Sequence, residues 1–212
     1  MPHTKCKTVY FFNELDERAK EKARDWYREA SANDTDWHES VTDDAKTCLK
    51  FLGWDVSNIY FSGFSSQGDG ACFEGSWRAA DVNAAGMREH APQDEKLNRL
   101  ADTFAQIAAK YPLATASVKQ RGHYSHEFCT AFDVDLPDEE LDNLDYGSPE
   151  YKARGAILQD VEKEIIELSR DAMRWVYRRL EAEYDYQNSD ETVDDNIRAN
   201  EYTFTEAGKR FG

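Results

Sequence analysis

Apolar side chains recur at intervals of three and four residues over four stretches of the chain. This spacing places side chains on one face of an α-helix, so each stretch is predicted to be amphipathic and helical. The longest stretch carries the apolar series Leu158, Val161, Ile165, Leu168, Ala172 and Trp175. The predicted helices span residues 13–30, 37–52, 94–111 and 151–186.

Shorter stretches are rich in β-branched and aromatic residues and are predicted to be strands. They span residues 8–12, 54–61, 71–78, 113–120, 127–136 and 202–205. Glycine-containing links join the second strand to the third and the fourth to the fifth, which is typical of antiparallel hairpins. The pattern therefore predicts an α+β fold: an antiparallel sheet of about five to six strands covered by helices, with one long C-terminal helix.

The chain has 212 residues, enough for one large domain or for a domain with an appendage. We expect an α+β core domain over residues 1–136. Residues 137–212 are expected to form an acidic helical extension whose final strand returns to the core, unless the two form one continuous domain. Within these regions, residues 80–92 are predicted to be a connector, in which the pattern leaves a helix open, and residues 187–196 an acidic loop.

Acidic side chains outnumber basic ones by 42 to 26, which gives a formal charge of −16. Such a charge disfavours direct binding to nucleic acid or to an anionic membrane and favours a basic partner. No apolar run approaches the roughly 18 residues of a membrane span, and residues 1–5 lack the apolar core of a secretory signal. The four cysteines form no C-x-x-C pair, so we expect free thiols in a cytoplasmic protein.

The acidic excess is concentrated near the C-terminus, where residues 133–212 carry 22 of the 42 acidic side chains and 10 of the 26 basic ones. Carboxylates on a rigid surface can imitate a nucleic-acid backbone and occupy a basic groove. The alternative is a solvated face that keeps the protein in solution. The candidate partner-binding residues are Asp138, Glu139, Glu140, Asp142, Asp145, Glu181, Glu183, Asp185, Asp190, Glu191, Asp194 and Asp195.

The predicted hairpin loop over residues 62–70 reads S-G-F-S-S-Q-G-D-G. Glycine-rich loops can cradle phosphate through backbone N–H groups, but this one has no lysine and precedes a strand. The alternative is a turn that needs glycine for a positive φ angle. The residues of possible function, including one from the next hairpin, are Ser62, Gly63, Gln67, Gly68, Asp69, Gly70 and Tyr124.

The second hairpin link leads into H-Y-S-H-E-F-C, residues 123–129. Its donor atoms suit a transition metal, yet their spacing does not match structural zinc sites, so no metal and no other cofactor is expected. If the four central strands share one sheet, both loops lie at the same end. One polar cluster would then contain Gln67, Asp69, His123, Tyr124, His126 and Glu127. Its acidic residues could act as ligands or bases, and its histidines as acids, bases or ligands.

Three sequence blocks together resemble a family of phage- and prophage-encoded proteins of unknown function. They are the N-terminal V-Y-F-F-N-E-L-D-E-R-A, with its Y-F-x-x-E-L pattern, the block S-G-F-x-x-Q-G-D-G-A at residues 62–71, and R-G-H-Y-S-H-E at residues 121–127. The resemblance implies a protein of the cytoplasm of an infected bacterium. It implies no catalytic residues.

Three functions follow as hypotheses. The first is an acidic binding protein that inhibits a bacterial nucleic-acid-handling defence complex, of anti-CRISPR or anti-restriction type, by nucleic-acid mimicry. Its partner would be a basic host protein or nucleoprotein complex. The second is a metal-dependent hydrolase or nucleotide-modifying enzyme that uses Asp69, His123 and His126. The third is an antitoxin that neutralises a basic toxin.

Overall fold

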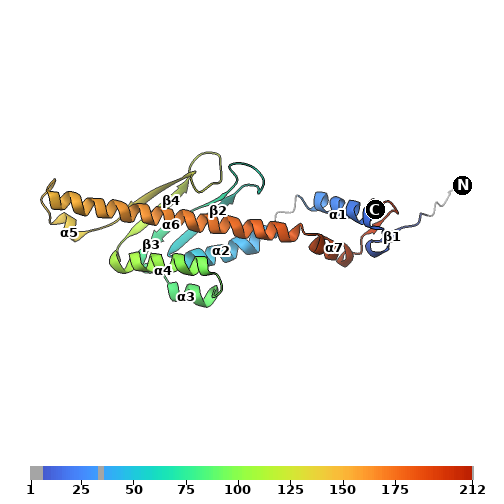
Figure 1. The fold of residues 1–212 in the computed structure, drawn as a ribbon, viewed down its shortest axis with the longest axis horizontal. Helices are drawn as coiled ribbons and strands as arrows, with labels where there is room; N and C mark the ends of the chain where they lie inside the picture. Colours follow the sequence, from blue (N-terminus) through green and yellow to red (C-terminus); the bar gives the residue numbers. More distant parts are fainter. Residues whose placement is uncertain (1–6, 33–35, 212) are drawn as a thin grey trace. The chain divides into compact units, whose positions relative to one another are not determined.

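The computed structural model describes residues 7–32 and 36–211 (Figure 1). The α-helices are α1 (Glu17–Ser31), α2 (Glu39–Phe51), α3 (Ala84–His90), α4 (Glu95–Lys110), α5 (Glu139–Asp142), α6 (Pro149–Gln187) and α7 (Asp190–Ala199). The strands are β1 (Tyr10–Phe11), β2 (Trp54–Phe61), β3 (Ala71–Arg78), β4 (Thr115–Gln120), β5 (Thr130–Asp135) and β6 (Thr203–Phe204). Short 3-10 turns are η1 (Phe12–Glu14), η2 (Asp36–His38) and η3 (Ala79–Asp81). The predicted α+β class, the antiparallel sheet and the long C-terminal helix are confirmed.

The chain divides into two compact units. The terminal unit takes Met1–Glu39 together with Ala182–Gly212, and the sheet unit takes Ser40–Glu181. This division differs from the expected boundary at residue 136, because the two chain ends fold together and most of α6 belongs to the sheet unit. The six strands accordingly form two sheets, one of four strands and one of two.

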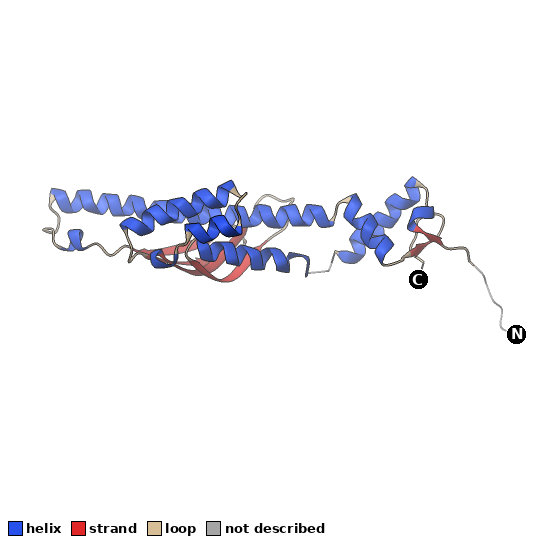
Figure 2. Cartoon of the chain, turned by 90° about the horizontal axis from the view of Figure 1, so that it is seen from below, coloured by secondary structure: helices blue, strands red, loops and turns tan. Residues whose placement is uncertain are grey.

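The sheet unit contains four antiparallel strands in the order β2-β3-β4-β5. Trp54 of β2 lies opposite Trp77 of β3, and both are buried. Trp77 packs against Phe104 of α4, and helices lie on one side of these strands (Figure 2). The opposite face carries polar residues such as Ser76, which is exposed. One face of the sheet is thus packed and the other solvated, as is common for antiparallel sheets.

Strands β2 and β3 approach each other very closely at Gly75. A Cβ atom at this position would lie 2.3 Å from the backbone oxygen of Asp55. The pairing is irregular here, with a bulge between Val56 and Asn58. At the nearby end of this strand pair, the Trp77 indole donates a hydrogen bond of 2.8 Å to the backbone oxygen of Leu52, and a Cβ atom on Gly53 would lie 2.8 Å from the indole nitrogen.

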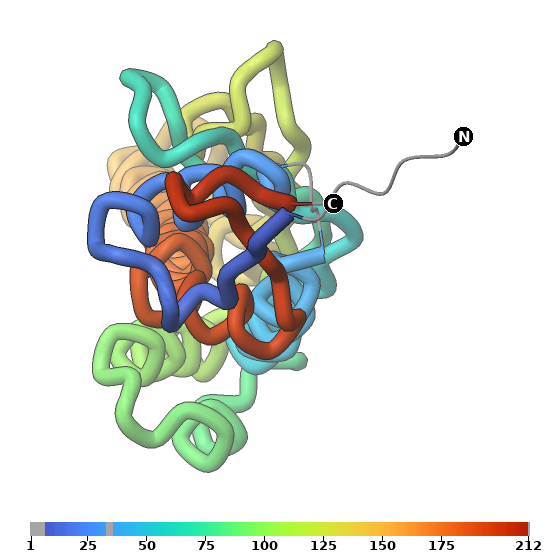
Figure 3. The backbone as a smooth tube through the Cα atoms, turned by 90° about the vertical axis from the view of Figure 1, so that its right-hand side faces the viewer, coloured from blue at the N-terminus to red at the C-terminus, as the bar shows by residue number. Residues whose placement is uncertain are grey.

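The terminal unit joins the two ends of the chain. Strands β1 and β6 pair antiparallel, so the N-terminal and C-terminal segments lie side by side (Figure 3). Helices α1 and α7 contribute to one core with these strands. Its buried residues are Phe12, Leu15, Ala19, Ala23, Val193, Ile197 and Phe204.

The prediction of a loop over residues 187–196 is wrong, because α7 begins at Asp190. Ser189 caps this helix by accepting a hydrogen bond from the backbone N–H of Thr192. The buried face of α7 carries Val193 and Ile197, which are four residues apart. Two apolar residues among many acidic ones give only a weak helical pattern in the sequence. In the predicted connector 80–92, η3 and α3 form, and Asn83 caps α3.

The described cysteines Cys48, Cys72 and Cys129 are free thiols, while Cys6 and residues 33–35 lie outside the described residues. Within the described part of the chain, no helix has both the length and the apolar character needed to cross a bilayer.

Replacement of Gly75 by alanine is expected to destabilise the sheet unit by about 1–3 kcal/mol, because the new methyl group collides with the β2 backbone. Gly155→Ala is the matched control. Gly155 lies inside α6, and a Cβ there meets nothing within 4 Å, so alanine is expected to stabilise the helix by about 0.5–1 kcal/mol. Urea unfolding followed by tryptophan fluorescence measures both. Equal effects of the two substitutions would contradict the close approach at Gly75.

Candidate functional site

The two hairpin loops, residues 62–70 and 121–129, lie at the same end of the four-stranded sheet. Strands β2 and β4 run in the same direction within the antiparallel order, so the loops that follow them emerge together (Figure 1). A Cβ atom on Gly70 would lie 2.8 Å from Cδ2 of His126. The expected placement of the two loops is therefore confirmed, and the loops touch where Gly70 leaves room for the imidazole.

The first loop uses its own carboxylate to hold its shape. Asp69 accepts hydrogen bonds from the backbone N–H groups of Ser65 and Ser66, at 2.9 and 2.6 Å. Gly68 has a φ angle of +97°, which favours glycine. Tyr177 of α6 donates its hydroxyl to the backbone oxygen of Gly63 at 3.1 Å. Burial, followed by the charges of Glu181 and Asp69, raises the pKa of that tyrosine.

The second loop is tied to α6 by a buried glutamate. Glu127 is 7% exposed, and its carboxylate lies 3.1 Å from Nδ1 of His126 and 3.2 Å from a guanidinium nitrogen of Arg174. Burial lowers the pKa of Arg174, but hydrogen bonds to Asp171 and Glu127 outweigh it and leave that pKa raised. This arrangement positions the loop against the helix.

The histidines do not converge with Asp69. His123 packs edge-on against Tyr124, with 5.8 Å between ring centroids, and both residues are exposed. Asp69, His123 and His126 are not among the described groups of side chains whose metal-ligand atoms lie within 4.8 Å of one another. The geometry therefore gives no support to a metal centre built from these three residues.

Five of the predicted partner-binding acids form ion pairs with arginines. In the sheet unit, Arg154 binds the carboxylates of Asp138 and Glu140, at 2.5 and 3.1 Å. The hydrogen bond from Arg154 lowers the pKa of Asp138, although partial desolvation opposes this. Asp138 also caps α5 by accepting from the backbone N–H of Leu141. These contacts fasten α5 to α6.

In the terminal unit, the arginines of α1 bind acids of α7. The Arg24 guanidinium donates two hydrogen bonds to Asp194, at 2.6 and 2.9 Å, and this pairing raises the pKa of Arg24. Arg28 holds Asp190 at 2.6 Å, which lowers the pKa of that aspartate. Asp195 pairs with a second α7 residue, Arg198. The ion pairs of Asp190 and Asp194 therefore join α1 to α7, whereas the ion pair of Asp195 lies within α7.

The other seven predicted acids have no ion-pair partner among the described residues. They are Glu139, Asp142 and Asp145 at α5, Glu181 in α6, and Glu183, Asp185 and Glu191 in the terminal unit. Four of them lie in the sheet unit and three in the terminal unit.

Two of the three unpaired acids at α5, Glu139 and Asp145, have a large exposed apolar side chain beside them. Tyr146 directly follows Asp145 and is 90% exposed, with its ring 5.1 Å from that of Tyr151. Leu113, 71% exposed, shares the lining of a hollow of about 210 Å³ with Glu139. We call Leu113, Glu139, Asp142, Asp145 and Tyr146 the acidic patch. Exposed apolar side chains rimmed by polar residues make this patch a candidate binding surface.

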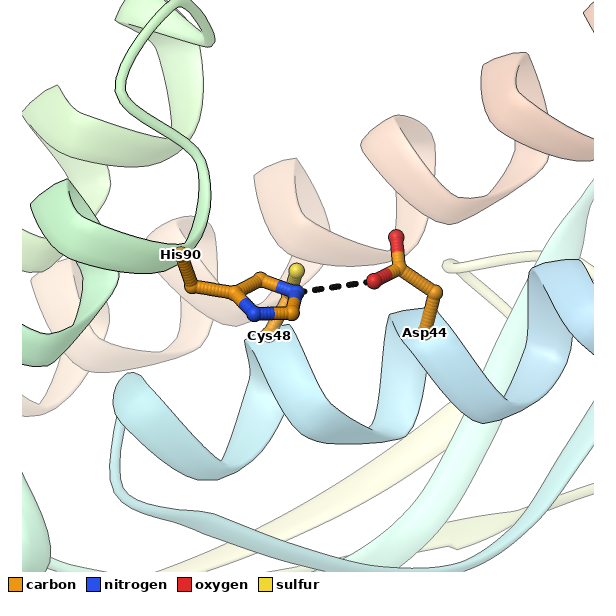
Figure 4. A group of neighbouring side chains, drawn as sticks. All are labelled: Asp44, Cys48 and His90. Atoms are coloured by element: carbon orange, nitrogen blue, oxygen red, sulfur yellow. Dashed lines mark hydrogen bonds and ion pairs between the residues drawn. The ribbon is translucent and has the colours of Figure 1, made fainter.

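The structure also brings together Asp44, Cys48 and His90, which the sequence analysis did not select (Figure 4). His90 Nε2 lies 2.8 Å from Oδ1 of Asp44, and the ligand atoms of all three residues lie within 4.8 Å of one another. Cys48 is buried, and burial, followed by the charges of Asp44 and Asp94, raises its pKa to about 12. The D-x-x-x-C spacing in α2 was a readable signal, but His90 lies in the segment predicted to be a connector.

Truncation of Asp194 tests whether the α1–α7 ion pair is structural. Asp194→Ala leaves the Arg24 guanidinium, whose side chain is 15% exposed, without its main partner, and is expected to destabilise the terminal unit by about 2 kcal/mol. Glu191→Ala, one turn earlier and unpaired, is expected to change stability by less than about 0.5 kcal/mol. Thermal unfolding by circular dichroism compares the two. A Glu191 variant as unstable as the Asp194 variant would refute the distinction.

Comparison with known proteins gives one match. Residues 37–190 match a family described as a domain of unknown function, DUF8835. No curated protein and no solved structure matches the chain significantly. The matched region contains the whole sheet unit and a short stretch of the terminal unit on either side of it. It includes the acidic patch and the Asp44, Cys48 and His90 group. Because the match covers well over half of the chain, the protein belongs to the DUF8835 family.

Proposed function

We propose that this chain is an acidic binding protein that docks on a basic protein partner through the acidic patch. The observation that carries the proposal is the juxtaposition of three carboxylates without ion pairs and an almost fully exposed tyrosine. Elsewhere in the C-terminal third, arginines bind many of the acids. At the patch, no described basic side chain forms an ion pair with Glu139, Asp142 or Asp145, although Lys110 and Arg154 line the same hollow as Glu139.

The two kinds of side chain have complementary roles in binding. Unpaired carboxylates steer a basic partner toward the patch and set its orientation. Exposed aromatic side chains supply the apolar contact that dominates the energy of many interfaces. Tyr146 and Leu113 meet this second need, because both lose a large exposed area when a partner covers them.

The partner class follows from charge and from the resemblance to phage and prophage proteins. A protein with a charge of −16 suits a partner whose own surface is basic, and proteins that handle nucleic acid carry such surfaces. We infer a defence complex of the bacterial host, of CRISPR or restriction type, whose nucleic-acid groove the acidic patch enters. An antitoxin would use the same surface on a basic toxin, and the identity of the captured partner separates the two.

The enzyme hypothesis has weaker support. Its Asp69 carboxylate accepts two backbone hydrogen bonds within its own loop, and Glu127 is held by His126 and Arg174. These residues are occupied in shaping the two loops and in joining the second loop to α6. The acidic patch has no comparable internal role.

Neutralisation of the patch tests the proposal. The triple variant Glu139→Gln, Asp142→Asn, Asp145→Asn is expected to bind the partner about tenfold more weakly, because exposed charge pairs contribute roughly 0.5 kcal/mol each. Tyr146→Ala is expected to weaken binding further, and high salt to reduce the effect of the charges. The partner is first isolated from nuclease-treated bacterial lysate, and its affinity is then measured by biolayer interferometry.

The matched control is Glu183→Gln, Asp185→Asn, Glu191→Gln, which removes three unpaired acids of the terminal unit and changes the net charge equally. It is expected to retain binding. Equal losses in both triple variants would show that only net charge matters and would reject the patch. Duplex DNA or guide RNA is also expected to compete with the protein for the partner, and failure of both to compete would reject mimicry.

A further inference from the structure

We propose that Asp44, Cys48 and His90 form a binding site for one divalent transition-metal ion of the zinc type. The ligands are a carboxylate oxygen of Asp44, the sulfur of Cys48 and a ring nitrogen of His90. This site is independent of the acidic patch and uses none of its residues. Figure 4 shows the three side chains directed toward a common point.

Two helices of the sheet unit position the ligands. Asp44 and Cys48 lie four residues apart on α2, so their side chains project from one face of that helix. His90 is the last residue of α3. The start of α3 is fixed to the end of α2, because the backbone N–H of Asn83 donates to the backbone oxygen of Phe51 at 2.9 Å. The imidazole is therefore held near α2 by the fold itself.

Close packing strengthens this placement. A Cβ atom on Gly86 of α3 would lie 2.7 Å from the Phe51 ring, so only glycine allows the two helices to approach this closely. The same ring lies 5.6 Å from the His90 imidazole, measured between centroids. His90 thus has an aromatic neighbour that limits its movement. Rigid placement of ligands favours metal binding because less conformational entropy is lost.

The ligand atoms lie within 4.8 Å of one another, so a tetrahedral ion requires them to adjust around it. Zinc bonds of roughly 2.0–2.3 Å place neighbouring ligand atoms about 3.3–3.7 Å apart. The His90 nitrogen and Asp44 oxygen lie 2.8 Å apart, so this hydrogen bond must open by about 0.5 Å to admit the ion. An ion pair alone explains that contact, but it leaves the nearby buried sulfur without a role.

The donor set selects the class of ion. Thiolate and imidazole ligands favour zinc and related ions over magnesium or calcium, which prefer oxygen. Three protein ligands leave a fourth position for water. Solvent reaches the site from the side of Asp44 and His90, whose side chains are 47% and 35% exposed, while Cys48 closes the buried side. The ion can therefore enter without unfolding of the sheet unit.

Titration of the full-length, tag-free, reduced protein with Co²⁺ tests the site. Cobalt bound by a thiolate gives a charge-transfer band in the near ultraviolet, which ions held only by surface carboxylates do not give. We expect this band at one ion per chain. Loss of even an outer partner of a metal ligand weakens binding roughly 10–100-fold. Cys48→Ser is therefore expected to remove the band, and His90→Gln and Asp44→Asn to weaken binding by about tenfold or more.

Cys129→Ser and His123→Gln are the matched controls, because they remove a thiol and an imidazole outside the site. Both are expected to bind cobalt normally. Zn²⁺ at about 100 times its Kd is expected to raise the Tm of the unsubstituted protein by roughly 5–10 °C.

Three results would overturn the site: no thiolate band in the unsubstituted protein, a band that persists in Cys48→Ser, or unchanged affinity in both His90→Gln and Asp44→Asn. If Cys48→Ser fails to fold, the two exposed ligands decide the outcome, because their substitution leaves the core intact.

Discussion

The sheet unit depends on burial of one face of the four-stranded sheet. Trp54, Phe73 and Trp77 on that face are almost completely buried. A slip of one residue between strands would exchange the buried and solvated faces, so this burial fixes the register. The close approach at Gly75 strengthens the same register, because it admits only glycine at that point. The positions of both hairpin loops and of the helices on the packed face follow from it.

Pairing with arginine divides the acidic side chains into two classes. Asp138 and Asp194 are largely buried and bind arginines across helix boundaries, so their charge contributes to folding. Glu139, Asp142 and Asp145 face solvent without such partners, so their charge remains available to another molecule. A net charge of −16 therefore does not describe one uniform surface. The same residue types form internal ion pairs at some positions and lie without ion-pair partners at others.

The packing of α3 against the end of α2 has a chemical consequence. It brings an imidazole to a carboxylate and a buried thiol that already share one face of α2. The two hairpin loops show the opposite outcome, because their polar groups satisfy one another or the backbone. Asp69 is bound by two N–H groups, and Glu127 by His126 and Arg174. The residue types at the two places are similar. The difference lies in the hydrogen-bond and ion-pair partners that the fold gives to each polar group.

Local side-chain patterns predict most of the helices and strands. Apolar spacing placed α4 and α6 within two residues of their observed ends, and the limits of β2 and β3 agree with the prediction. These elements are readable because side-chain periodicity is a property of neighbouring residues. The location of both loops at one end also followed, since it needs only the order of antiparallel strands. By contrast, the sequence pattern does not predict α7. Its many acidic residues leave only Val193 and Ile197 to show the helical spacing of its apolar face.

Which distant residues meet cannot be read from local patterns and follows from the packing of the whole fold. This packing divided the strands into two sheets, because β1 pairs with β6 at the other end of the chain. It gives Asp194 an ion-pair partner, Arg24, whereas Glu191 of the same short acidic helix has none among the described residues. It also brought His90 to Cys48. Such contacts depend on how helices and strands pack, and packing is set by the whole core rather than by any local pattern.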